Sequence, residues 1–128
     1  MKIKFYFSCD EDRVLFHNCM CLENPDRDPL SAYLRDNEGD KSYASYIGFL
    51  KKNLEILNNY NVNSYDLSSN SWSFYLDKNV VEICFLYNED NADYQLTLDR
   101  QKVAFIIRKW IEFLKKEPIE GYEEIIEV

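Results

Sequence analysis

The stretch SWSFYLDKNVVEICFLYNEDNADYQLTLDRQKVAFIIRKWIEFLKK, residues 71–116, decides the fold because it combines three strand-like segments with a strongly amphipathic helix. Apolar and polar residues alternate over 71–76, and the dense apolar run 80–87 predicts a strand buried on both faces. The alternation returns over 94–98, so the three segments predict an antiparallel meander. Over 100–116 the apolar spacing changes to three and four residues, which predicts a helix capped by Asp99. Its buried stripe is expected to contain Val103, Ile106, Ile107, Trp110 and Leu114.

The residues before this stretch predict two more strands and two more helices. Residues 2–7 alternate with Ile3, Phe5 and Phe7 on one face, and residues 13–21 can return antiparallel after an acidic turn at 10–12. A short helix is expected over 29–36, and a longer one over 40–59 that Asp40 or Ser42 can cap. The apolar stripe of this longer helix is expected to contain Tyr43, Ile47, Leu50, Leu54 and Leu57.

These elements predict a single α+β domain that spans residues 1–128. We expect an antiparallel sheet of about four to six strands, packed against two main helices at about 40–59 and 99–116. The acidic tail, residues 117–128, is expected to form either an extended edge strand or a mobile arm.

The charge balance favours a basic partner. The chain has 15 basic and 23 acidic residues, which give a net charge of −8. Such a field repels nucleic acid and anionic membranes and attracts basic proteins, although it also serves solubility alone. Five glutamates and no basic residue lie in the tail 117–128, and smaller acidic clusters lie at 10–12, 36–40 and 88–93. We therefore expect no direct binding of nucleic acid and no membrane association.

The compartment expected from the sequence is the cytoplasm. The N-terminal apolar run is interrupted by Lys4 and ends in three acids, unlike a signal peptide. The chain contains no apolar run of the length that spans a membrane. Four cysteines without a secretory signal indicate free thiols in a reducing compartment.

Four residues near the N-terminus have the chemistry of metal ligands: Cys9, His17, Cys19 and Cys21. Three cysteines and one histidine form a known zinc set, but structural zinc sites usually pair their cysteines in two C-x2–4-C knuckles. Here the pair is C-x-C, and no second knuckle follows. If residues 13–21 form a strand, His17, Cys19 and Cys21 share one face, which is typical of thiols packed as small apolar groups. We therefore expect neither a metal nor another cofactor.

The motifs of common enzyme classes are missing from the sequence. A cysteine two residues from His17 on a strand fixes neither an attack geometry nor an orienting third group, and no glycine-rich turn follows to form an oxyanion hole. Phosphate-binding, dinucleotide-binding and zinc-protease signatures are also missing. We therefore expect a protein that is not an enzyme and has no catalytic residues.

Residues 70–116 resemble immunity proteins of bacterial polymorphic-toxin and contact-dependent growth inhibition systems. The shared features are a Trp-bearing strand, a hairpin, an acid-rich turn, a short strand and a closing helix that ends in WIEFL. The resemblance implies a small cytoplasmic inhibitor that binds the C-terminal domain of one cognate toxin, often a nuclease, and occludes its active site or substrate groove. The acidic balance agrees, because a nuclease groove must be basic to hold phosphates.

The residues expected to contact the toxin are acids of two loops and the tail: Asp10, Glu11, Asp12, Glu89, Asp90, Asp93, Glu120, Glu123 and Glu124. Surface tyrosines are expected to assist them, unless half or more line the core: Tyr6, Tyr33, Tyr43, Tyr46, Tyr65, Tyr75, Tyr87 and Tyr122. Two alternatives stay open. One is a general acidic protein-interaction or adaptor domain, and the other is a metal-dependent sensor that uses residues 9–21.

Overall fold

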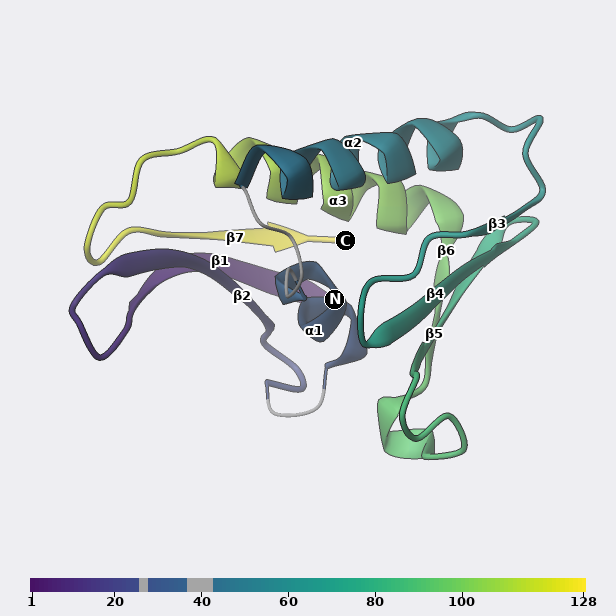
Figure 1. Ribbon diagram of the computed structural model, residues 1–128, viewed down its shortest axis with the longest axis horizontal. Helices are drawn as coiled ribbons and strands as arrows, with labels where there is room; N and C mark the ends of the chain where they lie inside the picture. Colours follow the sequence, from purple (N-terminus) through teal and green to yellow (C-terminus); the bar gives the residue numbers. More distant parts are fainter. Residues whose placement is uncertain (26–27, 37–42) are drawn as a thin grey trace.

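Two antiparallel sheets lie side by side beneath a pair of long helices in the computed structural model, which describes residues 1–25, 28–36 and 43–128 (Figure 1). The first sheet has the order β2-β1-β7 and joins the two ends of the chain: β1 (Lys2–Cys9), β2 (Leu15–Cys21) and β7 (Glu123–Glu127). The second has the order β3-β4-β5-β6: β3 (Ser64–Asp66), β4 (Trp72–Asp77), β5 (Val80–Phe85) and β6 (Leu96–Asp99). The helices are α1 (Pro29–Arg35), α2 (Tyr43–Asn58), α3 (Arg100–Leu114) and the single-turn 3-10 helix η1 (Ala92–Tyr94).

The α+β class is confirmed, and the two main helices form together with the expected short one, but the expectation of a single sheet is wrong, because the described strands form two sheets. The physical reason lies in α3, which is apolar over more than half of its circumference. Its predicted stripe is buried, and so are Ile111 and Phe113 beside it. The two sheets lie beneath successive parts of α3: Phe5 of the first sheet contacts Trp110 and Phe113 near the end of the helix, and β5 and β6 of the second sheet also contact it (Figure 1). The apolar face of α3 is thus covered by both sheets and by α2, and the buried residues form one continuous core.

The first sheet contributes aromatic side chains to this core. Ile3, Phe5 and Phe7 of β1 alternate inward, as predicted. The ring centroid of Phe5 lies 5.4 Å from that of Trp110 and 5.5 Å from that of Phe113. Aromatic pairs at this spacing are attractive beyond their buried area. The register Lys2↔Glu127 to Tyr6↔Glu123 holds β7 against β1, so the tail is an edge strand.

The two predicted helices of the N-terminal half are both present, with bounds that differ slightly from the prediction. α1 begins at Pro29, and Asp28 caps it by accepting hydrogen bonds from the backbone of Leu30 and Ser31. The described part of the longer helix is α2, and the proposed caps Asp40 and Ser42 lie outside the described residues.

The predicted apolar stripe of α2 is only partly correct. Leu50 and Leu57 are buried, whereas Tyr43 is 47% exposed and Tyr46 is buried instead. Asn53 is also buried, because its side-chain amide donates to Tyr33 Oη and to the carbonyl of Leu67. Hydropathy could not predict this face, since a buried amide is stable only when a distant partner accepts its hydrogen bonds.

Other local predictions also need correction. β5 ends at Phe85 and exposes Glu82, so it is buried on one face only. Tyr94 belongs to η1, and β6 begins two residues later than expected. Tyr33 and Tyr46 are core residues with exposures of 1% and 3%, so they cannot serve as surface anchors.

Arg100 is buried in the core although it is charged. Its guanidinium donates hydrogen bonds to five backbone carbonyls, at distances from 2.7 to 3.0 Å: Ile56, Leu57, Asn59, Val62 and Lys78. The first two are among the last carbonyls of α2, which have no partners within the helix. A positive charge at a helix C-terminus is also favourable for the helix dipole. One side chain thus joins the start of α3 to the end of α2, the following loop and the β4–β5 turn.

Candidate functional site

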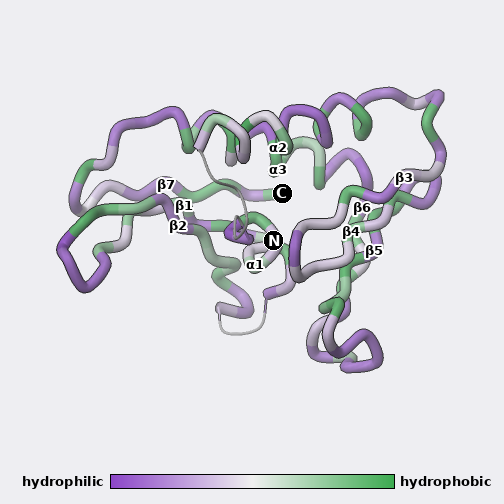
Figure 2. The backbone as a smooth tube through the Cα atoms, in the orientation of Figure 1, coloured by the Kyte–Doolittle hydropathy of each residue, from purple (hydrophilic) through white to green (hydrophobic). Residues whose placement is uncertain are grey.

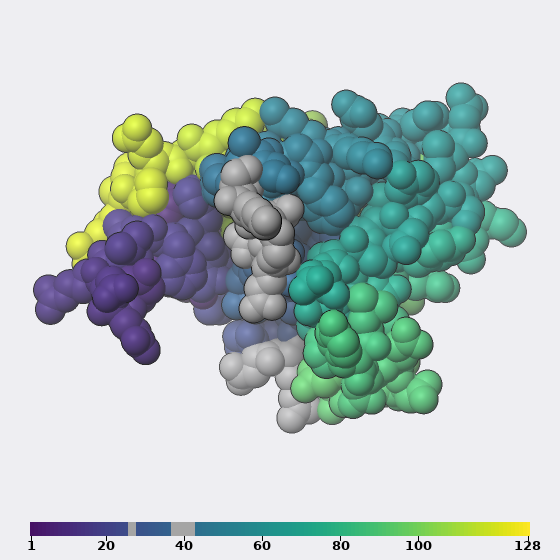
Figure 3. All heavy atoms as spheres, viewed as in Figure 1, coloured from purple at the N-terminus to yellow at the C-terminus, as the bar shows by residue number. Residues whose placement is uncertain are grey.

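The acids of the two chain ends gather at one end of the first sheet. We call the acidic end the β1–β2 turn, Asp10–Asp12, together with the glutamates that lead from α3 into β7: Glu117, Glu120, Glu123 and Glu124. The space-filling view shows the two segments in contact at the left of the molecule, in purple and yellow (Figure 3). In Figure 2 both segments are coloured mainly as hydrophilic, with hydrophobic stretches between. All of these acids are exposed except Glu124, which is half-buried.

The β1–β2 turn is held by its own first acid. Asp10 accepts hydrogen bonds from the backbone nitrogens of Asp12, at 2.9 Å, and Val14, at 2.8 Å. Arg13 takes the left-handed conformation with φ 61°, which such a tight turn requires. Because Asp10 is used in this way, Glu11 and Asp12 are the carboxylates of the turn that are free to meet a partner.

Aromatic and hydrogen-bonded contacts fix the tail beside this turn. The ring of Tyr122 lies 6.1 Å from Phe7, and His17 Nε2 lies 2.9 Å from the carbonyl oxygen of Lys116. Tyr122 Oη donates to Glu124 at 2.6 Å, and Lys116 Nζ lies 3.6 Å from the same carboxylate. The hydrogen bond to Tyr122 raises the pKa of Lys116. The position of the tail is therefore set by the fold.

The acidic end carries exposed apolar side chains as well as charge. Val14 is 58% exposed, Phe16 44% and Ile119 60%. Basic residues also occur here, and Lys4 Nζ lies 3.7 Å from Glu123. The acids still outnumber the bases, by seven to four if Lys4, Arg13, Lys115 and Lys116 are counted. Exposed apolar groups within a charged rim are typical of protein-binding surfaces.

The third predicted acidic cluster lies elsewhere. Glu89, Asp90 and Asp93 are in the loop and 3-10 turn between β5 and β6, at the lower right of the molecule (Figure 1). They belong to the second sheet, so the structure brings two of the three predicted clusters together and separates the third. Sequence reasoning missed Val14, Phe16 and Ile119, because the exposure of an apolar residue depends on which strand faces and which loops the other elements cover.

The His/Cys stretch faces the core. His17, Cys19 and Cys21 share the inner face of β2, as predicted, opposite Phe7, Phe5 and Ile3 in the register. The ring of His17 lies 4.8 Å from Phe7 and 5.2 Å from Phe113. Burial raises the pKa of Cys19 to about 12 and also raises that of Cys21, so both thiols stay protonated at neutral pH.

These residues do not assemble a metal centre. Cys9 is exposed at the far end of β1, whereas Cys19 and Cys21 are buried. Within residues 1–25, 28–36 and 43–128, no three His, Cys, Asp or Glu side chains lie where they could hold one ion. Zinc binds thiolates, and protonated thiols in a core are poor ligands. The geometry therefore gives Cys19 and Cys21 a packing role.

Replacing Cys19 with serine tests this packing role. Cys19 is fully buried and its Sγ lies 3.8 Å from the carbonyl of Ser31, so a hydroxyl there is expected to cost about 1–3 kcal/mol of unfolding free energy. The matched variant Cys9→Ser, at an exposed position, should change it by less than about 0.5 kcal/mol. Urea denaturation measures both. Purified protein that holds one equivalent of zinc, and loses it in both variants, would contradict the packing role.

A pocket of about 730 Å³ opens beside the acidic end, with Phe16, Tyr43, Trp110 and Pro118 in its wall. Its polar groups are engaged in the fold: Tyr43 Oη donates to the carbonyl of Leu114, and Trp110 Nε1 donates to Tyr46 Oη at 3.0 Å. The pocket therefore offers a partner apolar and aromatic contact area, and among the described residues that line it no two groups are arranged as a nucleophile and base.

Among the residues that the structure describes, every helix is too short or too polar to span a bilayer.

Comparisons with known proteins place the chain in a family. The whole chain, residues 1–128, matches the model of a family of unknown function, DUF5376. Over 108 residues it is 32% identical to an uncharacterized protein of Pasteurella multocida (strain Pm70). The aligned region covers 84% of this chain and 83% of that protein. No solved structure matches the chain. The chain belongs to the family of unknown function DUF5376.

Proposed function

We propose that this protein is a cytoplasmic immunity protein, which neutralises the C-terminal domain of a cognate bacterial toxin by binding it at the acidic end. It acts by binding alone and catalyses no reaction. The toxin domain is basic, a nuclease being the class that fits best. The observation that carries the proposal is the gathering of acids from both chain ends around the exposed Val14, Phe16 and Ile119.

The combination suits an inhibitor of a phosphate-binding enzyme. A nuclease groove carries lysines and arginines that hold the phosphate backbone, and carboxylates can occupy the same positions. Complementary charge speeds the encounter between two proteins, while buried apolar contacts slow their separation. The acidic end offers both kinds of contact on one surface. The resemblance of residues 70–116 to immunity proteins is independent of that surface, because it lies in β4, β5, β6 and α3.

Co-expression tests the proposal. The C-terminal domain encoded by the gene immediately upstream is expressed in a laboratory bacterial strain, with and without this protein. We expect the domain alone to stop growth and this protein to restore it. A catalytically inactive form of the domain, which should be harmless in both strains, controls for expression burden. Growth arrest that this protein does not relieve would contradict the immunity function. Relief that requires no complex between the purified proteins would contradict binding as the mechanism.

A further inference from the structure

β7 has an unpaired edge. In the sheet order β2-β1-β7, β1 is its only hydrogen-bonded neighbour among the described strands. In the opposite edge strand, β2, α1 packs against the inner face, and on the outer edge Asn18 Oδ1 already accepts a hydrogen bond from the backbone nitrogen of Cys19 at 2.8 Å. In the second sheet the edge strands β3 and β6 have only three and four residues. β7, with five residues, is longer than either edge of the second sheet, and no described residue bonds to its outer backbone groups.

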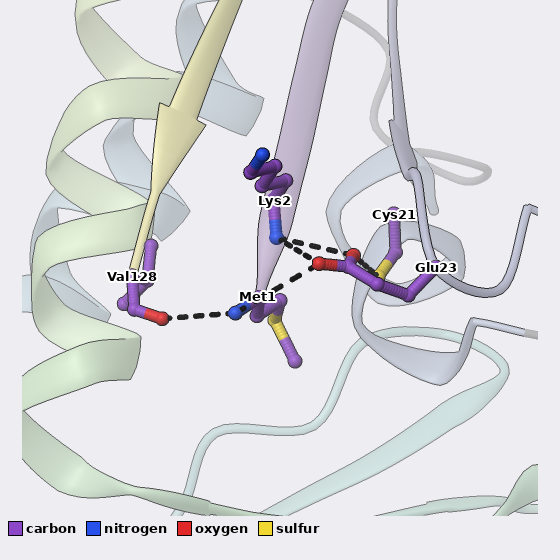
Figure 4. Close-up of polar contacts among 5 residues, drawn as sticks. All are labelled: Met1, Lys2, Cys21, Glu23 and Val128. Atoms are coloured by element: carbon purple, nitrogen blue, oxygen red, sulfur yellow. Dashed lines mark hydrogen bonds and ion pairs between the residues drawn. The ribbon is translucent and has the colours of Figure 1, made fainter.

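The ladder shows which backbone groups of β7 point outward. Val128 N donates to the carbonyl of Met1 at 2.8 Å. Met1 N donates back to Val128 O at 3.1 Å (Figure 4). Paired residues of an antiparallel ladder alternate between hydrogen-bonded and non-hydrogen-bonded pairs. From Val128 the alternation leaves the N–H and C=O groups of Glu123, Ile125 and Glu127 directed away from β1.

The other side of β1 supports this assignment. Leu22 N donates to the carbonyl of Lys2 at 2.9 Å, and Lys2 N donates to the carboxylate of Glu23 at 2.8 Å. The backbone N–H and C=O groups of the even-numbered residues of β1 therefore point toward β2, and those of the odd-numbered residues point toward β7. The hydrogen bonds on both sides of β1 lead to the same assignment. Three residues of β7 therefore present free backbone groups at regular spacing.

The side chains of these three residues form a pattern that a partner strand can match. Glu123 and Glu127 are exposed and flank Ile125, which is 54% exposed. On the paired edge of β7, lysines of β1 already lie close to these glutamates: Lys2 lies opposite Glu127, and Lys4 Nζ lies 3.7 Å from Glu123. Opposite charges across a strand pair are favourable. A strand added to the free edge would meet the same carboxylates with basic residues two positions either side of an apolar one.

The space beside the edge is open. A groove of about 500 Å³ lies between the C-terminal end of β7 and the start of α3, and its walls include Glu127, Gln101, Lys102 and Phe105. A strand along β7 would turn alternate side chains into this groove. Lys102 and the acids Asp99 and Glu127 line the groove together, so the partner side chains that enter it are expected to be neutral.

A second copy of this chain is a poor occupant. Two β7 strands paired about a twofold axis at Ile125 would place Glu123 of each copy opposite Glu127 of the other. Like charges directly opposite one another destabilise a strand pair. A strand with acidic side chains from any other protein meets the same difficulty.

We propose that β7 is a docking strand, to which an extended segment of a basic protein adds as a fourth strand of the first sheet. Basic residues of that segment lie opposite Glu123 and Glu127, and an apolar residue lies opposite Ile125. The partner is the toxin domain, in which respect the inference rests on the proposed function. Main-chain hydrogen bonds then supply affinity and the side-chain pattern supplies selectivity.

A designed peptide tests the docking strand without the toxin. The probe is Thr-Lys-Thr-Val-Thr-Lys-Thr, blocked at both ends, and the matched control replaces both lysines with glutamate. With the basic peptide at millimolar concentration, exchange of the amides of Glu123, Ile125 and Glu127 is expected to slow at least about tenfold. The amides of Glu124 and Ile126, which already bond to β1, should change little. The glutamate peptide should leave all five unchanged. A second control, the basic peptide with its central valine N-methylated, loses the N–H that faces Ile125 and should lose the protection.

Substitution of Ile125 provides the test on the protein side. Ile125→Pro removes only an N–H that points to solvent, a position where edge strands tolerate proline, whereas Ile125→Val keeps that N–H. Peptide binding is expected to fall at least about tenfold in Ile125→Pro and less than about threefold in Ile125→Val. Equal binding by both, or by the N-methylated peptide, would show mere charge attraction and overturn the docking strand. If Ile125→Pro does not fold, the N-methylated peptide alone decides.

The two proposals fail in different ways. Neutralisation of the toxin domain by wild type and Ile125→Pro alike would leave the immunity function standing and refute the docking strand. The predicted exchange pattern, together with an upstream domain that this protein does not neutralise, would support the docking strand and refute the immunity function.

Discussion

Replacing Arg100 with methionine is expected to lower the free energy of unfolding by about 4 kcal/mol, a large part of the stability of a domain of this size. The loss arises because five backbone carbonyls would each lose a hydrogen bond at once, although those of Ile56 and Asn59 keep a backbone donor. Each buried carbonyl left without a partner costs about 1–3 kcal/mol, and local rearrangement with water recovers part of the sum. Arg100→Lys should cost about 2 kcal/mol, since an ammonium donates at most three hydrogen bonds and lacks the planar fork.

The matched control lies on the same helix. Arg108 is exposed on α3, two turns after Arg100, and Arg108→Met should change the unfolding free energy by less than about 0.5 kcal/mol. Urea denaturation followed by tryptophan fluorescence measures all three variants. If Arg100→Met lies within about 1 kcal/mol of Arg108→Met, the bridge between α2 and α3 is not what holds the helices together.

Reversing charge at the acidic end is expected to slow association with the toxin domain. The double variant Glu11→Lys with Asp12→Lys should lower the association rate constant by about tenfold to a hundredfold at low salt. Asp10 is left unchanged, because its carboxylate holds the turn. The rate of the wild-type protein should fall as salt rises, whereas the reversed variant should depend little on salt. Stopped-flow fluorescence at two ionic strengths measures both effects.

The β5–β6 loop offers a control with the same change of charge. Glu89→Lys with Asp90→Lys alters the net charge of the molecule equally, at a surface that belongs to the second sheet. Its association rate should fall less than about threefold, through the overall field alone. Equal losses in the two double variants would mean that net charge, and not the acidic end, attracts the partner. A larger loss in the second would move the binding surface to the β5–β6 loop.

The elements that the sequence predicted well are those whose burial pattern is local. The apolar spacing of α3 and the alternation of β1 and β4 survive in the structure, because each buries the face that its own residues define. Asp99 caps α3 as expected, since a cap needs only the next residues of the chain. The shared inner face of His17, Cys19 and Cys21 follows from the two-residue period of a strand alone.

The features that the sequence could not predict depend on distant partners. The acidic end exists because β1 and β7, from opposite ends of the chain, pair with each other. Arg100 reads as an ordinary polar residue at the start of a helix, and its acceptors are backbone carbonyls, which leave no trace in the sequence. The burial of Asn53 needs Tyr33 and Leu67 on other elements. The division into two sheets likewise depends on which strands meet across α3.

The central claim is that the acidic end binds a basic toxin domain, and titration calorimetry of the purified protein against the domain encoded immediately upstream tests it most directly. The account predicts a one-to-one complex with a dissociation constant in the nanomolar range or below, weakened by salt and by reversal of Glu11 and Asp12. The absence of a complex would contradict it. So would a complex whose dissociation constant is the same at low and high salt and is unchanged by the reversal of Glu11 and Asp12.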